Sequence, residues 1–342
     1  MADVARLAGV SSAAASLALR GRPGVSAATR RRVQEAAHEL GYETRTAPAP
    51  VRPDRVAVMV GTSPEQEASR NAFYGPMLTG IAEEAARLDI SVRLHACPID
   101  DGFQPIDGPI LDDNLDGIMA VGVVLSDVLL AAIDDLPLVL VDAYLSHDAR
   151  PDPLKPARPH SSVRTDNAGG MQALTGHLLA MGHEGILLVG GDGFPSIAER
   201  AAAYRAAMVS ARLEPRHEIG PHDGDRGLAV KAADLVMADP SITAVVGVND
   251  VVAVSVMLEL LSRGIRVPSE VSVVGFDGLP MASLTTPQLD TAVAATTATG
   301  RQAVTALAHR IRHPADPTTV TAVATRLRVG GSVGSRAVRR TD

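Results

Sequence analysis

Aromatic residues are scarce in this 342-residue chain, at 2% in total, and tryptophan is absent. Alanine, valine, leucine and isoleucine must therefore supply most of the packed interior, because hydrophobic residues still make up 46% of the chain. The single cysteine, Cys97, excludes an internal disulfide and a cysteine-cluster metal site. The N-terminus has no apolar signal core, and no apolar run approaches the ~20 residues of a membrane span. We therefore predict a soluble, cytoplasmic protein with no membrane partner.

Signatures of the common enzyme classes are missing as well. The chain has no GKS or GKT phosphate loop, no GxSxG nucleophile turn, and no HExxH or His-x-His metal spacing. The stretch GGDGFPS at 190–196 follows a predicted strand, but Ser196 stands where a dinucleotide-binding loop has its third glycine. We interpret it as a strand-to-helix turn. The sequence thus predicts no catalytic residue, no metal ligand and no cofactor, and a protein that is not an enzyme.

Charge is distributed unevenly along the chain, whose net charge is −7. Residues 1–55 hold nine arginines against five acidic residues, which gives +4, so the remainder carries −11. A small basic segment on a larger acidic body is typical of a polyanion-binding module attached to another domain. An ordinary solvated surface gives the same asymmetry, so charge alone does not decide between the two.

The first 46 residues predict a small helical domain. Gly9 suits a tight turn, and the hydroxyl of Ser11 or Ser12 can cap the helix that follows. Ser26 is the expected cap of a third helix, which Gly41 ends. The three helices are expected over residues 3–9, 11–19 and 25–42, and the apolar stripe of the third comprises Ala28, Val33, Ala37 and Leu40. Two short helices joined by a turn are typical of a helix-turn-helix, whose second helix reads bases in the major groove.

A proline-rich linker follows over residues 47–55. Pro48, Pro50 and Pro53 rule out a regular helix there and favour an extended chain. The composition then changes to valine-rich and leucine-rich segments that alternate with amphipathic helices. This alternation predicts an α/β fold with doubly wound parallel sheets.

The body, residues 56–336, is predicted to form two lobes, because the alternating pattern restarts after a polar loop at 146–162. Strands are expected at 55–61, 91–97, 116–122, 137–143, 185–191, 244–250, 271–278 and 325–329. Helices are expected at 73–90, 168–183, 199–213, 229–238, 251–264 and 299–311. A cleft between the lobes at the carboxyl ends of the strands is the expected ligand site.

Polar residues lie where these strands or loops lead into helices. They are Asp166, Asn167, Arg200, Asn249, Asp250 and Asp277. Carboxylates, amides and a guanidinium that converge there can hydrogen-bond a small polar molecule. The same residue types cap helices and turns, and their positions alone do not separate the two interpretations.

The sequence resembles the LacI-type (lactose-repressor family) transcription regulators over nearly its whole length. The resemblance is carried by DVARLAGVS at 3–11, VSAATRRRVQEAAHELGY at 25–42, HLLAMGHEGILLVGG at 177–191 and, above all, GIRVPSEVSVVGFD at 264–277. It implies a helix-turn-helix head on a body like the type I periplasmic binding proteins. It also implies a homodimer that binds a small effector, often a sugar or nucleoside, between its lobes.

The resemblance assigns roles to individual positions. The implied effector contacts are Phe73, Tyr74, Asp166, Arg200, Asn249 and Asp277. The implied DNA-binding residues are Ser11, Ser12, Ala13, Ser16, Leu17, Arg20, Ser26, Thr29 and Arg30. Ser16, Ser26 and Thr29 match phosphate-contacting positions. Ser12, Ala13 and Leu17 match base-reading ones, and the arginines supply further positioning contacts.

Two departures from the family pattern bear on DNA binding. Leu17 stands where relatives usually carry arginine, and Ala14 stands where they carry threonine. APAPVRP at 47–53 replaces the hinge helix that wedges a leucine into the minor groove. A lost bidentate arginine costs roughly 1–3 kcal/mol of base discrimination. We therefore expect DNA binding that is weaker or differently specific than in relatives.

Taken together, these features predict an effector-responsive transcriptional regulator, with a repressor favoured over an activator. The expected partners are a palindromic double-stranded DNA operator, a small-molecule effector for which a carbohydrate is the candidate, and a second copy of the chain. A dimer is expected because the C-terminal residues lack the leucine heptads of a tetramerising helix. The alternative is a cytosolic small-molecule-binding protein whose head has lost or relaxed its operator specificity.

Overall fold

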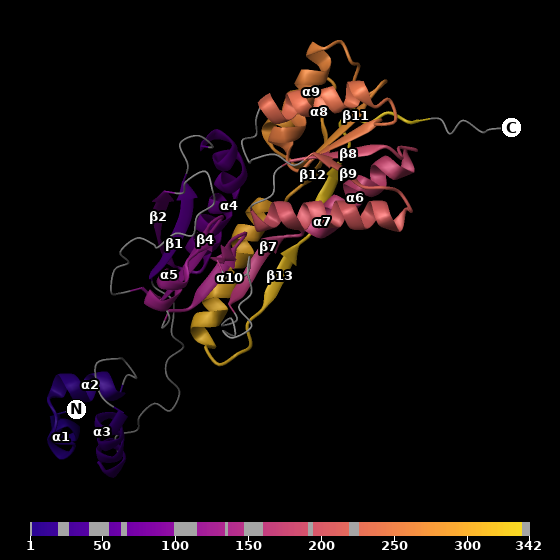
Figure 1. Ribbon diagram of the computed structural model, residues 1–342. Coiled ribbons are helices and arrows are strands. Elements are labelled where there is room, and N and C mark those ends of the chain that lie inside the picture. The colour runs from indigo at the N-terminus through magenta and orange to yellow at the C-terminus, as the bar shows by residue number, and fades with distance from the viewer. Residues whose placement is uncertain are drawn as a thin grey trace. The chain divides into compact units, whose positions relative to one another are not determined.

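The computed structural model describes residues 2–19, 27–40, 55–62, 67–98, 115–133, 136–146, 160–190, 194–218 and 226–336 (Figure 1). The chain forms two compact units, Met1–Arg52 and Pro53–Asp342, which we call the head and the body. The sheets of the body are parallel but for one antiparallel edge strand, so the fold class is mixed α/β, as predicted.

The head contains three short helices, α1 (Ala2–Leu7), α2 (Ser12–Leu19) and α3 (Ala27–Glu39). Gly9 turns the chain between the first two with φ of 63°, a conformation that glycine adopts without strain. The core is built almost wholly from alanine and valine, as the scarcity of aromatics required: Val4, Ala5, Ala8, Ala15, Ala18, Val33, Ala36 and Ala37. Leu40 is 45% exposed and follows the last helical residue, so its expected burial was wrong.

The first lobe of the body, lobe 1, is built on a six-stranded parallel sheet in the order β13-β7-β5-β3-β1-β2. Its strands are β1 (Arg55–Thr62), β2 (Ser91–Pro98), β3 (Gly117–Val121), β5 (Leu138–Val141), β7 (Ser161–Thr165) and β13 (Val320–Val323). Valines at 56, 58 and 60 face the long helices α4 (Glu67–Arg87) and α10 (Thr296–Arg312). Ala57 and Met59 face the opposite way, toward α5 (Asp127–Ala132). Successive side chains of β1 thus point to opposite faces of the sheet, and helices cover both faces.

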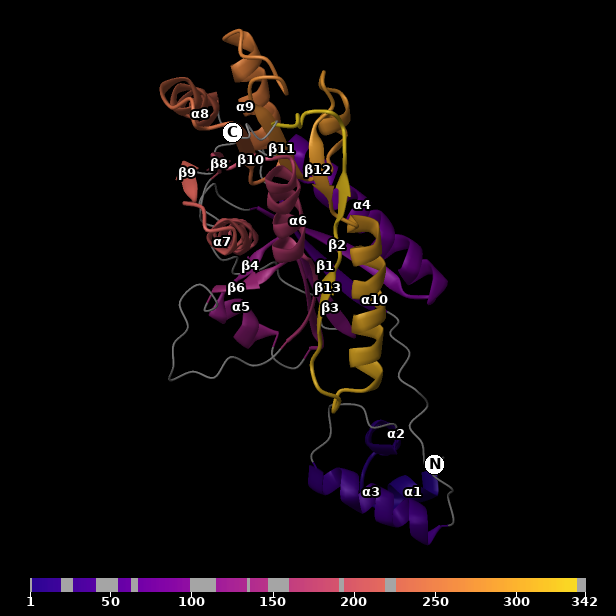
Figure 2. The same ribbon diagram turned by 90° about the vertical axis from the view of Figure 1, so that its right-hand side faces the viewer.

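Helices α4 and α10 pack closely where they cross (Figure 2). A Cβ atom on Gly300 would lie 2.1 Å from the carbonyl oxygen of Met77, and one on Gly80 would lie 2.1 Å from that of Thr297. Each glycine therefore allows the backbone of one helix to approach the other.

The second lobe, lobe 2, has the sheet order β14-β12-β11-β10-β8-β9, in which only β14 is antiparallel to its neighbour. Its strands are β8 (Ile186–Val189), β9 (Arg216–Glu218), β10 (Ala244–Gly247), β11 (Ser272–Asp277), β12 (Asp290–Val293) and β14 (Arg326–Arg328). Its helices are α6 (Asn167–Ala180), α7 (Pro195–Ser210), α8 (Arg226–Ala238) and α9 (Asp250–Ser262). Helices α6 and α7 cover one face of the sheet, and α8 and α9 cover the other (Figure 1).

The chain passes between the lobes three times. It leaves lobe 1 after β7, returns after β12 to form α10 and β13, and enters lobe 2 again as β14. A two-stranded ribbon of β4 (Val124–Leu125) and β6 (Tyr144–Leu145) lies beside the first lobe's sheet. Among the described helices, none has the length and apolar character needed to cross a bilayer.

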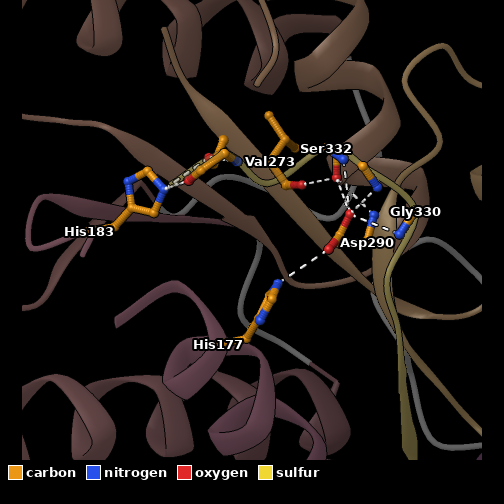
Figure 3. A network of polar contacts seen from close by, with 9 residues as sticks. His177, His183, Val273, Asp290, Gly330 and Ser332 are labelled. Atoms are coloured by element: carbon orange, nitrogen blue, oxygen red, sulfur yellow. Dashed lines mark hydrogen bonds and ion pairs between the residues drawn. The ribbon is translucent and has the colours of Figure 1, made fainter. Parts of the chain in front are cut away.

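A buried carboxylate fastens the last segment of the chain to lobe 2 (Figure 3). Oδ1 of Asp290 accepts hydrogen bonds from the backbone N–H groups of Gly330, Gly331 and Ser332, at 3.0, 2.7 and 2.9 Å. Its other oxygen lies 3.3 Å from Nε2 of His177 on α6. Three successive amides and one imidazole thus satisfy a side chain with no exposed surface.

Several predicted elements differ in extent from the observed ones. The polar loop expected over 146–162 contains the start of β7, and α4 begins at Glu67, six residues before the expected position. The short elements α5, β4, β6, β7, β9, β12 and β13 were not predicted. The remaining strands and helices match their predicted segments to within a few residues.

Candidate functional site

The head presents a short polar turn at the start of its second helix. Oγ of Ser11 accepts a hydrogen bond from the backbone N–H of Ala14, at 3.1 Å, so Ser11 caps α2 as one of the two expected caps. A hydroxyl that accepts in this way still holds a proton to donate to a phosphate. Ser12 is exposed, as are Arg31 and Arg32 on α3. The turn and α3 therefore offer hydrogen-bond donors and positive charge to the solvent.

Most of the other predicted DNA contacts carry no structural information. Thr29 lies on α3 and is half-buried. Ala13, Ser16 and Leu17 lie on α2, and Arg30 lies on α3, but their side chains are outside the described set. Arg20 and Ser26 lie outside the described residues altogether, as do Gly41 and the linker up to residue 54. Their roles remain predictions.

Arg200 is the centre of a polar network in the body. Its guanidinium is 4% exposed and donates to Oδ1 of Asn167 and to the carbonyl oxygen of Val248, both at 2.9 Å. Nη2 lies 2.9 Å from Oδ1 of Asp277, and Cζ lies 3.8 Å from the centre of the Phe276 ring. Arg200 is in the second turn of α7, so its expected place at a strand-to-helix junction was wrong. The Arg200 side chain is nevertheless long enough to bring its guanidinium to the strand ends, at Val248 and Asp277.

The network continues from lobe 2 into lobe 1. Nδ2 of Asn167 donates to Oε2 of Glu199 at 2.9 Å, and Oε1 of Glu199 lies 3.0 Å from Nη1 of Arg164. Arg164 belongs to β7 of the first lobe, whereas Glu199 belongs to α7 of the second. The two side chains are 40% and 34% exposed, so this ion pair is open to solvent. It joins the lobes at the place where their polar residues meet.

Two buried carboxyl groups of lobe 2 have raised pKa values. Burial raises the pKa of Asp277 to about 6, against the opposing effect of the Arg200 guanidinium. Burial, and then the charge of Asp277, raises the pKa of Asp250 to about 7. Asp250 accepts hydrogen bonds from the backbone N–H of Leu279 and the hydroxyl of Thr291, both at 2.6 Å. Asp277 has φ of 105°, an unfavourable conformation for a residue with a Cβ atom.

Lobe 1 contributes a third buried carboxyl at the end of β5. Asp142 is 5% exposed and has φ of 43°. Its oxygens accept hydrogen bonds from the backbone N–H and the hydroxyl of Thr165, at 2.7 and 2.8 Å. Burial raises the pKa of Asp142, partly offset by these hydrogen bonds. Thr165 ends β7, so this contact ties the ends of two adjacent strands together.

Aromatic side chains gather around this network, although the chain has only eight. Tyr74 lies against Gly122 at the end of β3, where a Cβ atom would be 2.3 Å from the ring, and Phe73 meets Tyr74 edge to face at 5.0 Å. Tyr144 of the first lobe meets Phe194 of the second at 5.3 Å with planes at 85°. With Phe276 under Arg200, five of the eight aromatic residues belong to this region.

The predicted effector residues divide into three pairs. Arg200 and Asp277 are in direct contact. Asp166 and Asn249 flank the network but use their side chains as helix caps, accepting from the N–H groups of Gly169 and Val252 at 2.8 and 2.9 Å. The capping interpretation is thus confirmed for Asp166 and Asn249, whereas their contact with an effector stays a prediction. Phe73 and Tyr74, both half-buried, lie at the lobe 1 strand ends.

Sequence reasoning passed over several members of the network. They are Asp142, Tyr144, Arg164, Phe194, Glu199 and Phe276. Asp142 follows a valine-rich strand, as Asp277 does. The reasoning that polar residues at strand ends are candidate ligand contacts could therefore have predicted it as well. Glu199 and Tyr144 gain their positions only when two lobes meet, and no local pattern marks them. Within the described residues, no group of three or more His, Cys, Asp or Glu side chains is placed to hold a metal ion.

A helix-turn-helix head joined to a two-lobed body with polar strand ends is the architecture of effector-responsive DNA-binding regulators. Two family models match the chain: the bacterial regulatory proteins of the lacI family over residues 1–45, and the periplasmic binding protein-like domain over residues 175–333. The chain belongs to the LacI family of transcriptional regulators, as its sequence predicted.

Individual relatives match over most of their length. The regulator CelR of Thermobifida fusca is 28% identical over 90% of each chain, and the repressor PurR of Vibrio parahaemolyticus is 29% identical over 91% of each. A solved complex of CelR with cellobiose has a TM-score of 0.65 at 25% identity and covers 97% of this chain and 98% of its own. The lac repressor dimer, bound to operator and an anti-inducer, has a TM-score of 0.67 at 21% identity over the same shares, which shows a common fold. These relatives are named as regulators and not as enzymes.

Proposed function

We propose that this chain is a repressor that binds a palindromic operator as a homodimer. It changes its operator affinity when a neutral, hydroxyl-rich small molecule of the sugar class binds between its lobes. The observation that carries the proposal is the network around Arg200 at the strand ends of lobe 2, which Asn167 and Glu199 extend to Arg164 of lobe 1. A ligand held by both lobes favours one lobe arrangement over others, as an effector must.

The charges of the network favour a neutral ligand. Arg200 is paired with Asp277, and Arg164 is paired with Glu199. A phosphorylated or carboxylated ligand has to displace one of these carboxylates before it gains a cation. A polyol can instead share the existing groups, because each hydroxyl both donates and accepts. The likeness to CelR, whose solved complex holds cellobiose, supports the same class.

The head supports DNA binding through positioning contacts more than through base readout. Arg31, Arg32 and the hydroxyls of Ser11 and Ser12 face the solvent on the turn and α3. The sequence of α2, SAAASLAL, has no amide or guanidinium side chain for bidentate base contacts. Base preference then falls to serine hydroxyls and to small apolar contacts with thymine methyl groups.

The deciding experiment is a selection of the full-length protein on random and genomic DNA fragments, followed by salt titration of the enriched sequences. A palindromic motif, bound well above non-specific DNA at physiological salt, supports the regulator. Repeating the measurement with cellobiose, glucose and ribose then tests the response to neutral sugars. Binding that disappears by roughly 200 mM salt, with no motif enriched, contradicts operator recognition.

The same alanine-rich α2 favours one rival function, a small-molecule-binding protein with relaxed operator specificity. The selection separates the two, because the rival retains sugar binding without an enriched motif. By linkage, a true repressor also shows the reciprocal effect: operator DNA changes the sugar affinity by the same factor as the sugar changes operator affinity.

A further inference from the structure

The hydroxyl of Tyr144 is buried without a hydrogen-bond partner within the described part of the chain. The residue lies on β6, two positions after Asp142, and is 6% exposed. A buried hydroxyl that forms no hydrogen bond destabilises the folded protein, so native structures almost always provide a partner. Tyr204, the other fully buried tyrosine, shows the usual arrangement: its hydroxyl lies 2.7 and 3.0 Å from the carbonyl oxygens of Ile186 and Arg216.

The ring of Tyr144 reaches across from one lobe to the other. Its backbone belongs to the β4–β6 ribbon of lobe 1, yet its ring packs in the hydrophobic core of lobe 2 against Phe194. Phe194 is the residue immediately before α7, the helix that carries Glu199 and Arg200. The hydroxyl is therefore placed beside the network that joins the two lobes.

The groups around this hydroxyl are already occupied. The negative charges nearest to it electrostatically are those of Glu199 and Asp142, which, after burial, raise the pKa of Tyr144 and keep its proton in place. Glu199 is engaged by Arg164 and Asn167, and Asp142 is engaged by Thr165. The hydroxyl of Tyr144 therefore keeps its proton and can donate it. It lies near the solvent-exposed ion pair of Arg164 and Glu199, and the nearby carboxylates already accept other hydrogen bonds.

We infer that Tyr144 is a specificity-determining contact of lobe 1: its hydroxyl donates a hydrogen bond to an oxygen of a neutral, hydroxyl-bearing ligand held between the lobes. This inference rests on the effector site proposed above and adds a residue to it. Selectivity arises because a ligand without an oxygen at that place leaves the hydroxyl buried and unpaired.

The test is Tyr144→Phe, which removes one oxygen and keeps the ring against Phe194. Its matched control is Tyr204→Phe. We expect Tyr204→Phe to lower the Tm of the ligand-free protein by several degrees, because it strands two buried carbonyl groups. Tyr144→Phe should leave that Tm unchanged or raise it. A loss of Tm in Tyr144→Phe as large as in Tyr204→Phe shows that the hydroxyl has a protein partner, and overturns the inference.

The binding arm uses isothermal titration of the wild-type chain and both variants with cellobiose, glucose, galactose and ribose. For each sugar that the wild-type chain binds, Tyr144→Phe should weaken the affinity roughly three- to tenfold, whereas Tyr204→Phe should not change it. Equal affinity of Tyr144→Phe and the wild-type chain overturns the role of the hydroxyl and leaves the effector site intact. Failure of the wild-type chain to bind any of the four sugars instead contradicts the proposed effector class, and the inference with it.

Discussion

Arg200 holds its place by three hydrogen-bonding or ionic contacts and one ring contact, and all of them use the flat guanidinium. A lysine at this position keeps the charge but reaches only one or two of the same partners. We therefore expect Arg200→Lys to reduce the free energy of unfolding by about 1–3 kcal/mol, through the acceptors that it leaves buried and unpaired. It should also weaken sugar binding at least tenfold.

Thermal unfolding and calorimetry check this expectation for Arg200. Arg205→Lys, further along α7 and outside the network, is the matched control and should leave both quantities close to their wild-type values. Equal losses in the two variants would show that the helix, and not the network, is sensitive to the change.

The raised pKa of Asp250 makes stability depend on pH in an unusual direction. A carboxyl whose pKa is about 7 in the folded state binds its proton more tightly than in the unfolded chain, so its contribution to stability falls as pH rises from about 4 towards 7. Asp250→Asn removes this effect, because the amide can accept from Leu279 and donate to the Thr291 oxygen. We expect its Tm, relative to the wild-type protein, to rise between about pH 5 and about pH 7 and to level off above that.

Asp239→Asn provides the comparison for this pH series. Hydrogen bonds from Ser241 lower the pKa of Asp239, so the Tm difference of this variant should stay constant over the same range. A flat difference for Asp250→Asn as well would mean that Asp250 is ionised throughout.

At the scale of elements, the contact between α4 and α10 depends on glycine. Gly300→Ala places a methyl group against the carbonyl of Met77, and we expect a loss of roughly 1–3 kcal/mol in denaturant unfolding. Gly176→Ala, in α6, meets no atom within 4 Å and should gain about 0.5–1 kcal/mol through the stiffer unfolded chain. Shifts of the same sign in both variants would show that the two helices can separate without cost.

The sequence predicted most of the elements, because valine-rich runs and helical periodicity are local signals. It missed β7, β12 and β13 for a physical reason: SSVRT, DTAV and VTAV are short segments whose pairing partners lie elsewhere in the sheets. Strand β7 pairs with β5 and β13, and β12 pairs with β11 and β14. The site residues show the same contrast between local signals and positions that depend on distant segments. Asp277 was found by the strand-end rule, whereas Tyr144 and Glu199 depend on the meeting of two lobes.

At the scale of the whole molecule, we propose that the homodimer forms along the edge of β2, the last strand of its sheet within the described residues. Val92, Leu94 and Ala96 share one face of this edge strand, and Leu94 is 55% exposed. An unpaired apolar edge is a ready surface for a second copy of the chain. We expect Leu94→Glu to convert a dimer into a monomer in sedimentation velocity.

The opposite edge of the same sheet supplies the control for the dimer. Val320 on β13 is 65% exposed, and Val320→Glu should leave the dimer intact. If Val320→Glu alone dissociates it, the interface lies at β13 instead.

Lobe 1 consists of two segments that are distant in the sequence, so the ribosome synthesises them at different times. Strands β1 to β7 and helix α4 emerge first, then lobe 2 as far as β12, and only afterwards α10 and β13, with β14 of lobe 2 last. Until α10 arrives, Met77 and Ile81 of α4 lack the part of their packing that α10 provides. A nascent chain that ends before α10 thus carries an unfinished first lobe and a second lobe without β14, and we expect it to need chaperones. A premature stop codon before α10 should accordingly yield a chain that is degraded, rather than a shortened regulator that still binds DNA.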